Sequence, residues 1–168
     1  MVLRTLLRLL LSLILTTSNQ YKKSLLFDLF QEDTSDKTAP PHFLTVTNKD
    51  AREDDGRIFL CHAQVYVLAE KYEVEALKQL SLSKLRHALI TFKQSEERSV
   101  DDVVTLLRYV YENTVDLVSS EEKLRALVVH YTACVVEELT PNLQFQALLE
   151  NEGALGRDLL KRLTSRLD

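Results

Sequence analysis

The residues best suited to chemistry in this chain are histidines and cysteines, which lie close together in two places. His130 and Cys134 are four positions apart, so on a helix they would share one face and could bind the same metal ion. Two ligands do not complete a metal site, and no matching second pair follows. Cys61 and His62 are adjacent and would point in different directions, which does not suit a nucleophile–base pair. We therefore expect two buried cysteines, a partly exposed His130, and no metal or cofactor site.

Acidic residues are the second candidates for chemistry, and they cluster at residues 53–55, 96–97 and 121–122. General acid–base catalysis needs a partner group and a pocket, and neither is suggested near these clusters. We interpret them as solvated faces and as negative charges at helix N-termini. The three glycines do not form a glycine-rich phosphate-binding pattern, and no G-x-S-x-G motif occurs. The residue patterns favour a protein that is not an enzyme.

Tyrosines are the residues that we expect at an interaction surface. Tyr109 and Tyr111 are two positions apart, so they face different sides of one helix, and one of them could be exposed beside Arg108. Exposed aromatic side chains beside arginine are typical of contact surfaces. The alternative is that both tyrosines pack against a neighbouring helix. The candidate interaction residues are Tyr66, Tyr72, Tyr109 and Tyr111.

The composition indicates a mainly all-α protein. A chain of 168 residues suffices for one domain and a tail, and its three glycines and three prolines are too few for a sheet with many turns. The net charge of −4 gives no general attraction to nucleic acid. Two cysteines and the absence of an N-glycosylation motif fit an intracellular protein of the cytoplasm or nucleus.

A helical hairpin over residues 57–92 is the element that must position the rest. Its first helix, Ile58 to Tyr72, is apolar on almost every side, which predicts a buried helix. Its second helix, Val74 to Phe92, has an apolar and a polar side and is expected to be amphipathic.

Four more helices are expected after the hairpin. Ser99 with Asp102 and Ser119 with Glu122 form capping-box patterns, and Thr140 precedes a proline suited to a first helical turn. The second of the four helices would run for about five turns, and a glycine would separate the last two. The basic residues of the last helix would face outward. The expected helices are 99–113, 124–139, 141–151 and 155–167, with Gly153 as the separator.

The first 56 residues have weaker patterns. Residues 1–20 are apolar and basic, so a signal peptide, a transit-type segment, an amphipathic helix and a start from a misplaced gene boundary all stay open. Residues 21–30 are expected to form a short helix. Residues 31–56 read as an irregular loop with a short β-element near 43–47. Secretory or organellar targeting therefore remains open beside the intracellular interpretation.

The hairpin sequence resembles a known family. HAQVYVLAEKYEVEALKQLSLSKLRHAL (residues 62–89) is similar to the helices that close the BTB/POZ domain in fungal-type proteins. Residues 103–114, 124–139 and 145–163 look like the helical extension after that domain, so the resemblance covers about residues 57–163. The residues matching H-A-x-V-Y-x-L-A-x-K-Y are His62, Ala63, Val65, Tyr66, Leu68, Ala69, Lys71 and Tyr72; those matching A-L-K-x-L-A are Ala76, Leu77, Lys78 and Leu80.

This resemblance implies a non-enzymatic protein-interaction module. It would be a scaffold or a ubiquitin-ligase substrate adaptor with protein partners, among them a cullin-type ligase scaffold. The D-V-x-(apolar) and F-x-V-H-K-x-(apolar)-L patterns of the family's strand-rich half do not occur in residues 1–56. That half supplies the family's sheet and much of its homodimer interface, so we expect an exposed apolar side and leave homo-oligomerisation open.

The resemblance divides the chain into four parts. They are an N-terminal segment (1–20), a linker or domain remnant (21–56), the helical part of the BTB-like domain (57–92) and the helical extension (99–168). Two other functions stay open. One is a small helical enzyme or ligand binder with a pocket near His62, His87 or His130, and the other is a secreted or membrane-attached helical protein.

Overall fold

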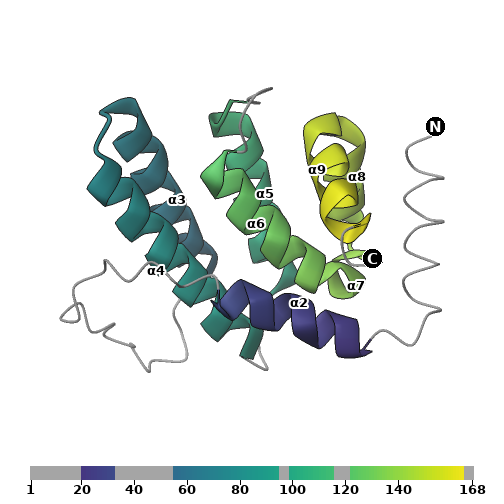
Figure 1. Cartoon of the computed structure of the whole chain (residues 1–168). Coiled ribbons are helices and arrows are strands. Elements are labelled where there is room, and N and C mark those ends of the chain that lie inside the picture. The colour runs from purple at the N-terminus through teal and green to yellow at the C-terminus, as the bar shows by residue number, and fades with distance from the viewer. Residues whose placement is uncertain (1–19, 33–54, 95–98, 116–121, 165–168) are drawn as a thin grey trace.

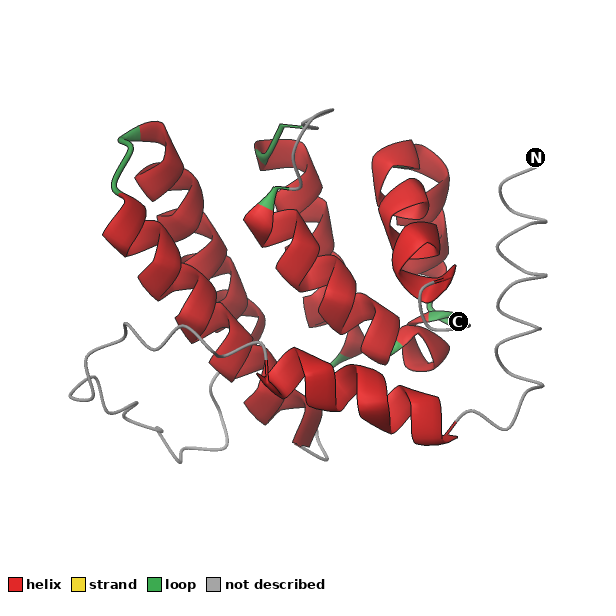
Figure 2. Cartoon of the chain, viewed as in Figure 1, coloured by secondary structure: helices red, strands yellow, loops and turns green. Residues whose placement is uncertain are grey.

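A computed structural model describes residues 20–32, 55–94, 99–115 and 122–164. All regular structure in these ranges is helical and no strand occurs in them, which confirms the predicted fold class (Figure 2). The short β-element expected near residues 43–47 lies outside the described residues, as does nearly all of the N-terminal segment. Among the described helices, none combines the length and the apolar character needed to cross a membrane.

The predicted hairpin is confirmed as α3 (Asp55–Lys71) and α4 (Glu75–Gln94), which pack closely against each other. Figure 1 shows the hairpin at one edge of the molecule, at the left of the view. Next to it lies the pair α5 (Val100–Asn113) and α6 (Lys123–Cys134), and α3 packs against α5. The remaining helices are α2 (Gln20–Glu32), α7 (Val136–Leu139), α8 (Leu143–Asn151) and α9 (Gly153–Thr164).

Helix α6 is the centre of the fold, because it packs against α2, α4, α5 and α9. Every residue from Leu124 to Cys134 except Ala126 is buried. One cluster of buried side chains joins the hairpin to the later helices, so the segments 57–92 and 99–168 share a core. Its largest fully buried side chains include Tyr131, Phe30, Phe59 and Phe145.

The predicted short helix is α2, which lies crosswise beneath the ends of α4 and α6 (Figure 1). Leu26 and Phe30 point inward, and the Phe30 ring lies 5.6 Å from the Tyr131 ring, measured between centroids. Arg86 of α4 donates a 2.8 Å hydrogen bond to the Phe30 carbonyl, and its guanidinium lies 5.1 Å from the centre of that ring. Helix α2 is therefore joined to both α4 and α6.

Two predicted helix boundaries are wrong. The helix expected over 124–139 is interrupted at Val135, whose φ of −120° and ψ of 14° are not helical, and α7 begins at the next residue. Five helices therefore follow the hairpin in the described residues. Gly153 does not stop a helix but begins α9, and the break lies at Glu152, with φ −105° and ψ 83°. Helical periodicity continues through both breaks, which is why it does not reveal them.

The three predicted caps also differ from those observed. Ser99 does precede α5, but its side chain makes no capping hydrogen bond. Glu122 is itself the N-cap of α6 and accepts from the Arg125 N–H at 2.8 Å, so it does not occupy the third helical position. Helix α8 begins after Asn142, whose side chain accepts from two backbone N–H groups, and Thr140 ends α7 instead. Glu122 and Asn142 can replace the expected caps because their side chains also carry acceptor oxygens.

Candidate interaction surface

Helix α3 buries only one of its two apolar sides. Its inner side packs on α4 and α5, and its Phe59 ring meets the Phe92 ring edge-on at 5.1 Å between centroids. The expectation of a helix buried all round is therefore wrong. The edge position of α3 explains this, because no described helix covers its other side (Figure 1). The buried residues of α3 are Gly56, Phe59, Ala63, Tyr66 and Ala69.

The other side of α3 carries an apolar stripe, which we call the outer stripe. Its residues follow one another at intervals of three and four, the spacing that lines up side chains along one helix face. Leu68 is 52% exposed and Tyr72 is 66% exposed, and Cys61 is exposed as well, contrary to the prediction that it is buried. The outer stripe consists of Ile58, Cys61, Val65, Leu68 and Tyr72. Ile58 and Val65 are partly buried, and Tyr72 directly follows the last residue of α3.

Positive charge borders the outer stripe. Arg57 and Lys71 lie one position before Ile58 and Tyr72, and both side chains are exposed. On α4, Lys84 comes near enough to His62 to affect its titration: burial first, and then the charge of Lys84, lowers the pKa of His62. His62 is therefore held towards its neutral form, and the positive charge beside the stripe comes from Arg57, Lys71 and Lys84.

The turn between α3 and α4 contains a strained residue next to this surface. Glu73 has a φ of 57°, a left-handed conformation that is unusual for a residue with a side chain. The Val74 N–H donates to the Ala69 carbonyl at 2.9 Å and the Glu73 N–H to the Glu70 carbonyl at 3.1 Å. These two bonds form a Schellman motif, in which glycine usually occupies the position of Glu73. The motif leaves Val74 exposed beside Tyr72.

Ion pairs hold this end of the hairpin against the start of α6. Lys78 contacts the carboxylates of Glu70 and Glu75, and Lys123 of α6 donates to Glu75 at 3.2 Å. The hydrogen bond from Lys123, with help from Gln79 and Lys78, lowers the pKa of Glu75. The hydrogen bond to Glu70 raises the pKa of Lys78. The Lys123–Glu75 pair is exposed, and exposed ion pairs contribute little stability individually.

Two of the four predicted interaction tyrosines are buried. Tyr66 is only 2% exposed and donates a 2.6 Å hydrogen bond to Glu122, the residue that caps α6. Tyr111 is buried and donates to Asp158 of α9 at 2.9 Å. In both cases burial, followed by the nearby carboxylate, raises the tyrosine pKa well above its ordinary value. These tyrosines join helices within the molecule and do not form its surface.

The other two predicted tyrosines are accessible to different degrees. Tyr72 is exposed at the end of the outer stripe, so its predicted role in an interaction stays a prediction. Tyr109 is partly buried and packs against the core, and burial raises its pKa. The sequence placed Tyr109 and Tyr111 on different sides of a helix, and the structure shows one in the core and one at its margin.

Arg125 is a buried cation that the sequence patterns did not single out. Its guanidinium lies 4.5 Å from the centre of the Tyr111 ring. It donates to the Thr114 carbonyl at 2.5 Å and to the Thr114 hydroxyl at 2.7 Å. Arg125 thereby connects the start of α6 to the end of α5, and its role is to join these helices.

His130 and Cys134, the candidate metal pair, are both buried inside the fold. His130 is 4% exposed, contrary to the prediction of a partly exposed ring. Its Nε2 lies 3.2 Å from the Leu26 carbonyl of α2, and Arg162 of α9 donates to its Nδ1. A carbonyl only accepts and a guanidinium only donates, so the ring is neutral with its proton on Nε2. Within the described residues, no group of three or more potential metal ligands occurs.

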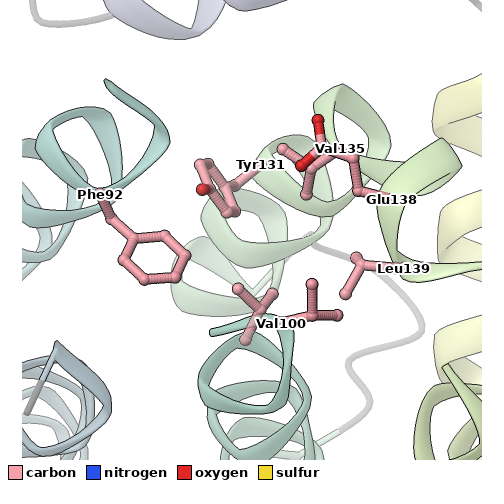
Figure 3. A pocket seen from close by; sticks show the side chains of 7 residues that line it. Phe92, Val100, Tyr131, Val135, Glu138 and Leu139 are labelled. Atoms are coloured by element: carbon pink, nitrogen blue, oxygen red, sulfur yellow. The ribbon is translucent and has the colours of Figure 1, made fainter. Parts of the chain in front are cut away.

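A small cavity lies near the junction of α4, α5 and α6. Its volume is about 10 Å³, which is room for about one water molecule. Figure 3 shows Phe92, Val100 and Tyr131 around it, with Glu138 on the far side. The cavity is mostly apolar, and His62 and His87 are not among its lining residues. It does not bring together the polar groups that a small-molecule site usually contains.

Comparison with family models, curated proteins and solved structures finds no match to this chain. The surface must therefore be interpreted from its own geometry. The signal for the outer stripe was present in the sequence as the spacing from Ile58 to Tyr72. It was missed because α3 is apolar on its inner side as well, and spacing alone does not show which side is covered.

Proposed function

We propose that this chain is a non-enzymatic protein-interaction module that uses the outer stripe of α3 as its contact surface. The observation that carries this proposal is the apolar stripe along an edge helix, in which Cys61, Leu68 and Tyr72 are exposed and Ile58 and Val65 are partly exposed. Contiguous exposed apolar surface on a folded protein is typical of a site that binds another protein. Tyr72 adds an exposed aromatic side chain, a residue type enriched where binding energy concentrates.

The resemblance to BTB/POZ proteins supports this proposal. In that family the helices matching α3 and α4 close a domain whose other half is rich in strands, and the outer stripe lies on the first of these helices. By this resemblance the module would act as a scaffold or a ubiquitin-ligase substrate adaptor, with a cullin-type ligase scaffold among its partners. The proposed role needs no cofactor, because the contact is made by apolar burial.

An intracellular location belongs to the same proposal. Cys61 is a free thiol and is exposed on α3. Exposed free thiols persist best where the cell keeps cysteines reduced, as in the cytoplasm and nucleus.

The experiment compares two substitutions at exposed leucines. Leu68→Asp introduces a charge into the outer stripe, and Leu143→Asp does the same on α8, where the leucine is 79% exposed. Wild-type and variant proteins are used as baits, and each captured protein is then tested with purified components. We expect a partner whose binding is lost with Leu68→Asp and kept with Leu143→Asp. If no captured protein distinguishes the two variants, the outer stripe is not the contact surface.

A further inference from the structure

The spacing of the outer stripe specifies the shape of what it binds. From Ile58 to Tyr72 the intervals are three, four, three and four, which is the heptad pattern of a helix that packs along another helix. The stripe spans about two heptads, or ~21 Å at 1.5 Å per residue. A surface that binds a loop or a sheet does not require apolar residues at heptad spacing. The geometry therefore favours a second helix lying along α3.

The short length of the stripe bears on the strength of binding. Two heptads are fewer than the three or four that mark an independent coiled coil, but α3 is already held in its helical form by α4 and α5. The partner alone has to become ordered, as in helix-in-groove recognition. A contact of this length buries less surface than a standard stable interface, so the complex should be reversible.

The charges beside the stripe select the partner. In heptad packing, the residues that flank the apolar seam set partner choice through their charges. Arg57, Gln64 and Lys71 recur every seven residues along one flank, and Lys84 of α4 adds positive charge near His62 on the other. No acidic residue stands in that seven-residue series. Carboxylates on the partner would meet these cations.

The same charges disfavour a second copy of this chain as the partner. In an antiparallel pair of α3 helices the same flank of each helix comes together, which places Arg57 of one copy near Lys71 of the other. Like charges at such positions oppose pairing. A parallel pair would bring Arg57 towards His62, which offers no negative charge. An antiparallel pair would therefore place positive charge against positive charge, and a parallel pair would leave Arg57 without an opposite charge from His62.

From these observations we infer that the outer stripe binds an amphipathic helix of a partner protein whose apolar seam is flanked by Asp or Glu. This inference rests on the proposed function and identifies the chemical class of the partner. The apolar seam of the partner would pack on Leu68 and Tyr72. Its carboxylates would lie along Lys71 and Lys84.

The test uses designed peptides and the full chain. Two helical peptides of three heptads carry the same Leu and Ile seam, one with Glu and the other with Lys at the flanking positions. A third peptide has the sequence of residues 55–72 and represents a second copy. Binding is measured by fluorescence anisotropy at low salt and in 0.5 M NaCl, with wild-type protein, Leu68→Asp and Leu143→Asp. Light scattering gives the size of each protein, and circular dichroism verifies its fold.

We expect the Glu peptide to bind about tenfold more tightly than the Lys peptide at low salt, with the difference reduced in high salt. Leu68→Asp should abolish this binding and Leu143→Asp should not. Equal binding of the Glu and Lys peptides overturns the inferred partner chemistry but keeps α3 as a contact surface. Tighter binding of the 55–72 peptide than of the Glu peptide, or a dimer that is lost with Leu68→Asp, overturns the inferred acidic partner in favour of a second copy of this chain. If no peptide binds, the inference of a helical partner is overturned. The proposed function is tested separately, by the captured proteins that distinguish Leu68→Asp from Leu143→Asp.

Discussion

Helices α3 and α6 are both apolar on nearly all sides, yet they are buried to different extents. Helix α6 is buried along almost its whole length, whereas α3 buries one side and exposes the other. The difference follows from position, because α6 packs against α2, α4, α5 and α9, whereas α3 packs mainly on α4 and α5 and reaches the start of α6 through Tyr66. The apolar character of α6 is explained by its neighbours within the fold, whereas no helix packed against α3 in the described residues accounts for its exposed apolar side.

The comparison is tested most directly by matched leucine substitutions. Leu124 of α6 is fully buried, so Leu124→Ala should lower the free energy of unfolding by about 3 kcal/mol through lost burial and a residual cavity. Leu68→Ala on the outer stripe should change it by less than about 0.5 kcal/mol. Urea denaturation followed by circular dichroism measures both. Equal losses would mean that the outer side of α3 is covered in the folded chain.

The next largest effect is expected at Arg125, which connects α6 to α5. Arg125→Ala removes the donor to the Thr114 carbonyl and the cation beside the Tyr111 ring, so stability should fall by about 2 kcal/mol. Arg108→Ala, at an exposed position of α5, is the control and should change stability little. Thermal unfolding of the two variants gives the difference. A stable Arg125→Ala protein would show that the helices hold together without this connection.

The connection between the two compared helices should fail at high pH. The pKa of Tyr66 is raised in the fold, so its contribution is complete below the unfolded value of about 10 and is lost as pH rises above it. Tyr111 behaves in the same way. Unfolding free energy should fall above pH ~10 by about 1 kcal/mol per pH unit for each tyrosine. Tyr66→Phe should reduce this dependence of the unfolding free energy on pH. An unchanged dependence would mean that Tyr66 does not cause it.

The smallest effect is expected at the turn that ends α3. Glu73→Gly places the favoured residue in the left-handed position and should raise stability by about 0.5–1 kcal/mol. Gln64→Gly, at an exposed position inside the helix, should instead lower stability by a similar amount. Urea unfolding midpoints distinguish a stabilising from a destabilising substitution, provided that the dependence of the unfolding free energy on urea concentration is the same in both variants. Loss of stability with Glu73→Gly would show that the side chain of Glu73 contributes more than its backbone strain costs.

The sequence predicted the helical class and the hairpin because periodic apolar residues and capping residues are local signals. It did not predict which apolar helix lies at the centre, since Cys61 and Cys134 occur in similar apolar segments but only Cys134 is buried. The interruption at Val135 and the inward position of His130 also depend on neighbours that are distant in sequence. Of the four candidate tyrosines, only Tyr72, which directly follows α3, is exposed, because a tyrosine is equally suited to a core hydrogen bond.

The neutral His130 ring has a consequence for sequence variation. It gives a hydrogen bond to α2 and accepts one from α9, so it joins two segments from opposite ends of the chain. Few side chains of similar length can both donate one hydrogen bond and accept another. Glutamine can do both, whereas leucine can do neither and lysine can only donate. Among natural variants of this protein, we expect positions 130 and 162 to change together. In a variant that lacks Arg162, the Nδ1 of His130 loses the hydrogen bond from that side chain, so we expect a different residue at position 130.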